Sequence, residues 1–297
     1  MYKLSQRQWT VLVLLTIVWG INWPIMKLGV RDFPPLTFRA ICAVIGLPLF
    51  ALVLRQLKVG YAIPRKHWRE VFDLGLLNMV LWHGLIILAV KALSSGRAAI
   101  LGYTMPIFSA ILGAWLFGNL MPTRAWAGVA AATLGVVLLL WHEFTQLSGQ
   151  PLGVALALLA AAAWALGTQR LRHTPIKEST LTIVFWMTAM TMVSMVACAI
   201  VFERHLWKMP VGLNWVAIAF NAVLVYAFSQ AAWFYLARSL PPVISTLSVM
   251  MIPVLGVFSG AWWLGEVLHW QDWTAVALML LSIAFVLMPV RPARPAP

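Results

Sequence analysis

Residues 106–118 read PIFSAILGAWLFG, and residues 253–265, which lie 147 positions later, read PVLGVFSGAWWLG. A proline, a Gly-Ala-Trp triplet and a final glycine occupy the same places in both stretches. The match continues without a gap, because Trp126 falls on Trp273 and Leu134 falls on Leu281. Both stretches lie in apolar runs long enough to cross a bilayer as helices. We therefore predict an all-α integral membrane protein that contains an internal repeat.

Apolar segments of about 20 residues recur along the whole chain of 297 residues. Their apolar residues are continuous rather than alternating, which favours transmembrane helices over barrel strands. The composition agrees, since 62% of the residues are apolar and only 10% are charged, whereas a soluble domain has about 25% charged residues. We predict ten transmembrane helices, at residues 8–30, 35–54, 71–91, 95–117, 123–141, 152–169, 180–202, 213–236, 240–264 and 271–289.

The predicted organisation is two five-helix repeats, at residues 1–146 and 147–290, followed by a disordered basic tail at 291–297. Because five is an odd number, the second repeat must enter the membrane from the opposite side, so the repeats are inverted. Inverted repeats give two related conformations that open to opposite sides, which is the geometry of an alternating-access carrier. The alternative is a duplication that serves only folding, as in some channels.

The net charge of +13 comes from 21 Lys and Arg residues against 8 Asp and Glu residues. The basic residues lie between the apolar runs rather than on one face, so nucleic acid is not an expected partner. If the N-terminus is cytoplasmic, about two-thirds of these cations fall in cytoplasmic connections, as the positive-inside rule requires. We therefore predict a multi-pass protein of the lipid bilayer with both termini in the cytoplasm. A monomer would suffice for a five-plus-five carrier.

The sequence argues against several classes of chemistry. Cys42 and Cys198 both lie within apolar runs, so they form neither a disulfide framework nor a metal-ligand set. No phosphate-binding glycine loop of Walker type is present, and no connection is long enough to hold a soluble domain. His83 lies about three helical turns from Ser94 and Ser95, so a hydrolase would need a nucleophile from another helix. We expect no enzyme activity, no cofactor and no metal.

Three motifs connect the chain to a known family. Residues 19–29 read WGINWPIMKLG, residues 34–40 read PPLTFRA and residues 264–266 read LGE. With ten predicted helices in two repeats, the whole chain resembles the EamA-type branch of the drug/metabolite transporter superfamily. This resemblance implies a bacterial inner-membrane exporter of amino acids or related metabolites, and the Trp-rich helices resemble those of YddG-type aromatic amino-acid exporters. The chain departs from the family at Asn119, where the first repeat commonly carries a counterpart of Glu266.

Polar and aromatic side chains at membrane depth are the candidate substrate ligands, because a polar group inside a bilayer usually faces a cavity or another helix. Tyr226, Gln230 and Trp233 share one helix face by their spacing of three and four residues. His83 is the repeat equivalent of Gln230. We expect the two faces to converge on a central cavity that holds the amino and carboxyl groups of an amino acid. The predicted substrate-binding residues are Trp19, Asn22, Asn78, Trp82, His83, Tyr103, Trp164, Trp186, Tyr226, Gln230 and Trp233.

Each of these residues also has a purely structural interpretation. An interhelical hydrogen bond, worth about 0.6 kcal/mol on average in membranes, would explain a polar side chain, and core packing would explain a tryptophan. Trp164 is the preferred wall residue, because its place in the helix over 152–169 is roughly equivalent to that of Trp19 in the first helix. Pro106 and Pro253 interrupt matched helices and are predicted to be paired hinges, or else static kinks.

The carboxylates bear on the driving force, since all 8 of them fall at or beyond the ends of predicted spans. Proton relays typically use a buried carboxylate or histidine, and sodium sites also commonly need a carboxylate. Only His83 lies at depth, and an ordinary histidine titrates near pH 6.5. The sequence therefore favours facilitated diffusion down the substrate gradient. The alternative is a proton-coupled exporter of drugs, lipophilic cations or other small metabolites.

Overall fold

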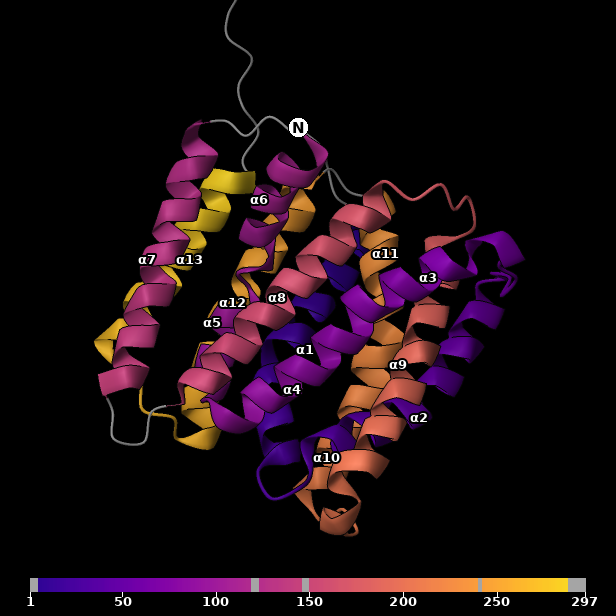
Figure 1. Cartoon of the computed structure of the whole chain (residues 1–297), viewed down its shortest axis with the longest axis horizontal. Coiled ribbons are helices and arrows are strands. Elements are labelled where there is room, and N and C mark those ends of the chain that lie inside the picture. The colour runs from indigo at the N-terminus through magenta and orange to yellow at the C-terminus, as the bar shows by residue number, and fades with distance from the viewer. Residues whose placement is uncertain (1–4, 119–122, 146–149, 240–241, 288–297) are drawn as a thin grey trace, which may run out of the picture.

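The computed structural model describes residues 5–118, 123–145, 150–239 and 242–287, which are mostly helical and contain no strand (Figure 1). The chain first forms α1 (Gln6–Val30), α2 (Pro35–Gln56), η1 (Arg65–His67), α3 (Trp68–Gly75), η2 (Leu76–Leu81), α4 (Trp82–Ala92), α5 (Ser95–Gly102), α6 (Met105–Phe117) and α7 (Thr123–Thr145). It continues with α8 (Pro151–Arg172), α9 (Thr180–Glu203), η3 (Arg204–Leu206), α10 (Leu213–Phe220), η4 (Asn221–Ser229), α11 (Gln230–Ser239), α12 (Pro242–Leu264) and α13 (Trp270–Leu287). Asn119, the predicted repeat boundary at 146 and 147, and the predicted tail at 291–297 lie outside the described residues.

Seven of the described helical stretches are long and apolar enough to cross a membrane: Gln6–Val30, Pro35–Gln56, Arg65–Ala92, Ser95–Leu116, Pro151–Arg172, Thr180–Leu206 and Leu213–Trp233. Shorter apolar stretches lie in α7, α12 and α13, at Trp126–Leu139, Met251–Leu264 and Trp270–Phe285. The outer surface is also apolar, since Trp115 and Trp262 are 80% and 86% exposed. Such a surface is suited to lipid rather than to water. The chain is a multi-pass helical membrane protein.

The helices pack in pairs that are distant in sequence. α7 packs along α13, α1 along α12, and α2 along α9. In Figure 1, α7 and α13 form one edge of the molecule, α2 and α9 lie toward the other, and α1, α4, α5 and α8 run between them.

The predicted span over 95–117 is two helices rather than one. α5 ends at Gly102 and α6 begins at Met105. Pro106 explains the break, because it has no N–H to donate to the Gly102 carbonyl four residues earlier. Thr104 closes the turn by donating its backbone N–H and its hydroxyl to the Leu101 carbonyl, at 3.1 and 2.6 Å. Pro253 instead lies inside the continuous helix α12. The sequence predicted that both prolines interrupt their helices, but only the helix that contains Pro106 is interrupted.

Two π-helical segments change the winding of their spans just before predicted site residues. η2 ends two residues before His83, and η4 ends directly before Gln230. Within η4, the hydroxyl of Ser229 donates to the Leu224 carbonyl five residues earlier, at 2.7 Å. A π-segment rotates the residues that follow it about the helix axis, and such segments are frequent at functional sites. η2 and η4 therefore set the directions in which His83 and Gln230 point.

Candidate substrate-binding site

A cavity of about 220 Å³ lies inside the helical bundle, and its lining comes from both halves of the chain. Most of its lining is apolar or aromatic, with a few polar groups, which is the usual composition of a small-molecule site. None of the described residues that line it is Asp or Glu. The residues that line it are Trp19, Asn22, Trp23, Met26, Arg39, Asn78, Met79, Trp82, His83, Ile86, Tyr103, Met105, Trp164, Thr168, Leu171, Val184, Met187, Val225, Gln230 and Trp233.

The structure brings most of the predicted substrate-binding residues to this cavity, and it places two of them elsewhere. Trp186 lies away from the cavity, where its indole N–H donates to the Tyr61 carbonyl at 2.7 Å and its ring packs edge-on against Trp68 at 4.8 Å. Trp186 was predicted to line the cavity because it lies inside a predicted membrane span. That position does not determine which face of the helix the residue occupies. The sequence interpretation of Trp186 as a lining residue is therefore corrected.

Tyr226 lies behind the cavity wall rather than on it. Its ring stacks on that of His83, with centroids 5.1 Å apart and planes 25° apart, and only 1% of the residue is exposed. The predicted face assumed regular α-helical spacing from Tyr226 to Gln230, whereas η4 is π-helical through Ser229. The change of winding separates Tyr226 from the face of Gln230 and Trp233, and Tyr226 supports His83 from behind.

Aromatic side chains form three pairs around the cavity. Ring centroids are 5.6 Å apart in the pair Trp19–Trp233, 5.1 Å in Trp82–Trp164 and 6.3 Å in Trp23–Tyr103. The pairs are tilted or edge-to-face, which is the preferred arrangement of aromatic rings. Indole faces attract another aromatic ring or a cation. The walls of the cavity are therefore suited to an apolar, and especially an aromatic, substrate.

Two glycines allow the wall residues to pack closely. A Cβ added to Gly102 would lie 2.7 Å from the ring of Trp23, and one added to Gly167 would overlap the side-chain amide of Asn78. Real Cβ atoms essentially never approach other atoms so closely. The positions of Trp23 and Asn78 in the cavity wall therefore depend on glycine in α5 and α8.

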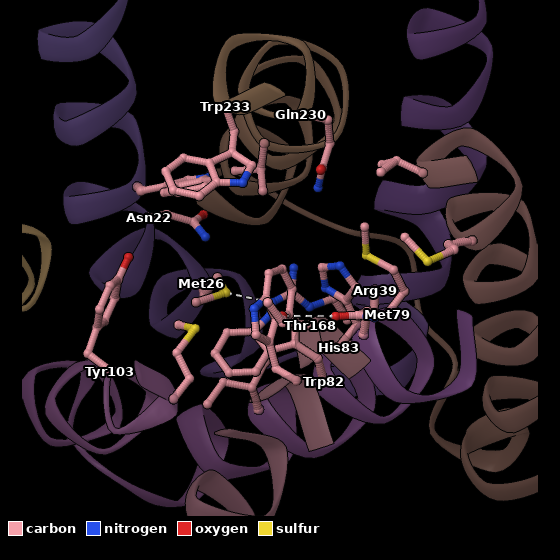
Figure 2. Close-up of a pocket in the computed structure, with 18 of the residues that line it drawn as sticks. Asn22, Met26, Arg39, Met79, Trp82, His83, Tyr103, Thr168, Gln230 and Trp233 are labelled. Atoms are coloured by element: carbon pink, nitrogen blue, oxygen red, sulfur yellow. Dashed lines mark hydrogen bonds between the residues drawn. The ribbon is translucent and has the colours of Figure 1, made fainter. Parts of the chain in front are cut away.

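Several buried polar atoms of the lining have no hydrogen-bond partner among the described residues. They are Asn22 Oδ1, Arg39 Nε, and both ring nitrogens of His83. In contrast, Thr168 donates to Asn78 Oδ1 at 3.3 Å. Leaving a buried polar group unsatisfied costs about 1–3 kcal/mol, so a hydrogen bond from a bound molecule would stabilise these atoms. Figure 2 shows Gln230 and Trp233 facing Arg39 and His83 across the open space.

Arg39 is the main cavity residue that sequence reasoning missed. It belongs to the PPLTFRA motif, which the sequence analysis used for the family resemblance, but it was not among the predicted substrate-binding residues. In the structure it lies one turn inside α2 and is only 2% exposed. A signal for Arg39 was present in the sequence. Arg39 follows Pro34 and Pro35, which start the helix, so its guanidinium belongs to the predicted membrane span and not to the loop before it.

A layer of polar contacts closes the bundle at the end where α1 finishes. The Lys27 ammonium donates to the carbonyls of Val90, Lys91 and Leu93 at 2.6–3.0 Å. The Lys91 ammonium donates in turn to the carbonyls of Val30 and Arg31. Both cations thus lie at helix C-termini, where the helix dipole favours positive charge. These contacts join the ends of α1 and α4.

Two carboxylates in the same layer cap the starts of helices. Glu203 accepts hydrogen bonds from the backbone N–H groups of Leu36 and Thr37, at 3.0 and 2.7 Å. Glu266 accepts from those of Ser95 and Gly96, at 2.6 and 3.2 Å. An ion pair joins Arg97 to Asp272 at 2.8 Å. We call the set Lys27, Lys91, Arg97, Glu203, Glu266 and Asp272 the closing layer.

The cavity extends from just inside the closing layer toward the opposite end of the bundle. Near the closing layer, Met26 directly precedes Lys27, and Arg39 lies two residues after Thr37. The lining residues Trp164, Thr168 and Leu171 belong to the last turns of α8, and Val184 and Met187 to the first turns of α9. These turns are at the end of the bundle where α1 begins, whereas the closing layer is at the end where α1 finishes.

Within the described residues, no group of three His, Cys, Asp or Glu side chains is placed to hold a metal ion.

The fold and the cavity define a multi-pass helical membrane protein with a central small-molecule site. The EamA-like transporter family matches the chain twice, over residues 8–141 and 151–288. The chain belongs to this family and is a membrane transporter.

Relatives of similar length support this classification. The chain is 26% identical to the uncharacterized inner membrane transporter YedA of Escherichia coli, with 94% of this chain and 91% of the relative covered. It is 25% identical to the uncharacterized transporter YoaV of Bacillus subtilis, over 84% and 86%, and 23% identical to a protein of Salmonella typhimurium named a probable amino-acid metabolite efflux pump, over 94% of each. A crystal structure at 20% identity shares the fold, with a TM-score of 0.65 over 93% of this chain and 97% of that one.

Proposed function

We propose that this transporter is an alternating-access exporter of amino acids, mainly aromatic and other apolar ones, and that it works by facilitated diffusion in the bacterial inner membrane. The observation that carries the proposal is the cavity, in which paired aromatic rings lie beside buried polar atoms that have no partner among the described residues. The rings suit an apolar side chain, and the polar atoms suit the amino and carboxyl groups. A relative named a probable amino-acid metabolite efflux pump supports the same substrate class, and the paired rings support the aromatic selectivity of YddG-type exporters.

The proposal includes ten transmembrane helices arranged as two inverted repeats, at residues 1–146 and 147–290. The double match to the family supports this arrangement. Further support comes from features separated by 147 positions: Gly118 and Gly265 follow the ends of α6 and α12 and both have a φ of 66°. In addition, η2 shifted by 147 positions falls within η4. Repeats of this kind give two conformations open to opposite sides.

In this scheme both termini are cytoplasmic, and the closing layer is the outer gate. The conformation described here then has its cavity on the cytoplasmic side of the closed gate, ready to receive a substrate for export. A monomer suffices, because both repeats of one chain line the cavity. Facilitated diffusion is favoured over proton coupling because no carboxylate, and no histidine other than His83, lines the cavity among the described residues.

Flux of radiolabelled amino acids in liposomes tests the proposal. We expect saturable flux of tryptophan, phenylalanine and methionine by the purified protein, with counterflow against unlabelled substrate and no need for an imposed pH gradient. Counterflow requires one site that is exposed alternately to the two sides, so its absence would contradict the carrier mechanism. Flux that requires the gradient would favour the proton-coupled alternative, and no amino-acid flux would move the search to drugs and other metabolites.

The aromatic wall makes a separate prediction about Trp164. Its ring packs edge-on against that of Trp82 at 5.1 Å, and aromatic pairs contribute about 0.5–1.5 kcal/mol beyond area burial. Trp164→Ala should therefore weaken the affinity for tryptophan and phenylalanine about fivefold and that for threonine less than twofold, measured by competition of flux. Trp126→Ala, at a tryptophan that is 55% exposed, is the control. Equal losses for all three amino acids would assign Trp164 a structural role only.

A further inference from the structure

Arg39 is a buried cation that has no carboxylate partner among the described residues. Only 2% of it is exposed, and it lines the cavity. One terminal nitrogen of its guanidinium donates to Asn221 Oδ1 at 3.2 Å, and the other lies 2.7 Å from the Met26 sulfur. Its Nε has no partner among the described residues. Figure 2 shows the contact with Met26 at the cavity surface.

The three carboxylates of the closing layer have other partners. Glu203 and Glu266 accept hydrogen bonds from helix N-termini, and Asp272 pairs with Arg97. A charged group within a membrane protein is costly unless it is paired. A thioether is a weak hydrogen-bond acceptor, so the contact with Met26 compensates the guanidinium poorly. Arg39 is therefore a cation whose counterion has to come from the contents of the cavity.

We propose that Arg39 binds the carboxylate of the transported solute, so that the cavity selects small carboxylates with an apolar body. The proposal deepens the proposed function, on which it rests for the assignment of this cavity as the transport site. A guanidinium presents parallel N–H groups that match the two oxygens of a carboxylate. Exchanging the Met26 sulfur for a carboxylate oxygen would turn a weak contact into a charge-assisted one.

The rest of the cavity is consistent with the remaining groups of an amino acid. Asn22 Oδ1 is an acceptor without a partner among the described residues, and an ammonium is a donor of three hydrogen bonds. The pairs Trp19–Trp233 and Trp82–Trp164 supply the apolar surface. A lipophilic cation without a carboxylate would meet the like charge of Arg39, which disfavours it. Arg39 thus distinguishes zwitterions and carboxylates from simple cations.

A ligand series on the wild-type protein in lipid nanodiscs tests this selectivity without a substitution. The four probes are tryptophan, tryptophan amide, tryptamine and indole-3-propionate, and binding is followed by calorimetry. Tryptophan and indole-3-propionate carry the carboxylate, so we expect each to bind at least tenfold more tightly than the amide and tryptamine. Equal binding of tryptophan and its amide would overturn the proposal.

Three variants then connect the selectivity to Arg39. In Arg39→Gln the preference for the two carboxylates should fall at least tenfold, and Arg39→Lys should recover part of it, because the charge is kept and the paired N–H geometry is lost. Arg31→Gln, at an exposed arginine just before α2, should leave the series unchanged. If Arg39 only holds α2 to η4, all four probes should weaken equally, which would contradict the proposal.

The outcomes separate this proposal from the proposed function. Binding of indole-3-propionate that depends on Arg39, without flux of any amino acid, would support the carboxylate site and contradict amino-acid export. Amino-acid flux with equal binding of tryptophan and tryptophan amide would support amino-acid export and contradict the carboxylate site. If Arg39→Gln does not fold, the four probes on the wild type and on Arg39→Lys decide. Unchanged affinities in Arg39→Lys would contradict a carboxylate bound by two parallel N–H groups of Arg39. A reduced preference for the two carboxylates would support it.

Discussion

Replacing His83 with alanine should slow tryptophan transport about thirtyfold while the folded protein remains in the membrane. His83 lines the cavity, is 5% exposed, and has no hydrogen-bond partner on either ring nitrogen among the described residues. A hydrogen bond to a charged group contributes about 1.5–3 kcal/mol, so losing one to a zwitterionic substrate accounts for an effect of this size. Initial flux rates in liposomes with equal amounts of folded protein measure it.

Two further variants show what His83 does. His83→Gln keeps hydrogen-bonding capacity and removes the titrating ring, so a facilitated carrier should retain much of its transport in this variant. A proton-coupled carrier should lose its coupling in His83→Gln as fully as in His83→Ala. His67→Ala, outside the cavity in η1, should transport at the wild-type rate. Unchanged transport in His83→Ala would remove His83 from the site.

The sequence predicted features that depend on composition and periodicity. Continuous apolar runs identified the helical membrane segments, because a bilayer permits few other structures for such runs. The candidate residues at membrane depth largely converged on the cavity, since polar groups in a membrane avoid lipid and face inward. His83 and Gln230, which the predicted repeat makes equivalent, both line the cavity, and each lies in a span that contains a π-segment.

Features that depend on tertiary contacts or on helix winding were not predictable in this way. Trp186 and Tyr226 lie deep in their helices, but neighbouring helices and the π-helical winding of η4 place them away from the cavity surface. The role of Arg39 was missed because its burial depends on Asn221 in η4, which is 182 positions away. The contact of Glu203 with Thr37 joins residues 166 positions apart, and a local sequence pattern cannot predict such a contact.

In the proposed alternating-access scheme, replacing Glu266 with glutamine should weaken the closing layer and shift the protein toward the conformation that is open on that side. One carboxylate oxygen accepts from the Ser95 N–H at 2.6 Å, and the other from the Gly96 N–H at 3.2 Å and the Ser95 hydroxyl at 2.9 Å. Glutamine replaces one of these oxygens with an NH₂ group, which would direct a donor at a donor. The negative charge at the N-terminus of α5 is lost as well.

These two losses together are worth about 2 kcal/mol, which corresponds to roughly a thirtyfold change in the equilibrium between the two conformations. The measurement is the rate at which a membrane-impermeant maleimide, applied from the side of the closing layer, modifies Ile86→Cys. Ile86 lines the cavity and is 1% exposed, so the reagent reaches it only when the layer opens. Cys42 and Cys198 are replaced beforehand, so that the new cysteine is the only target.

Glu178→Gln is the matched control, because it makes the same chemical change outside the closing layer, at a carboxylate with one buried oxygen that has no partner among the described residues. It removes no helix cap, so its modification rate should equal that of the wild type. Faster modification in both variants would point to a general loosening of the protein rather than to the gate. Equally slow modification in both would mean that Lys27, Lys91 and Glu203 hold the layer closed without Glu266.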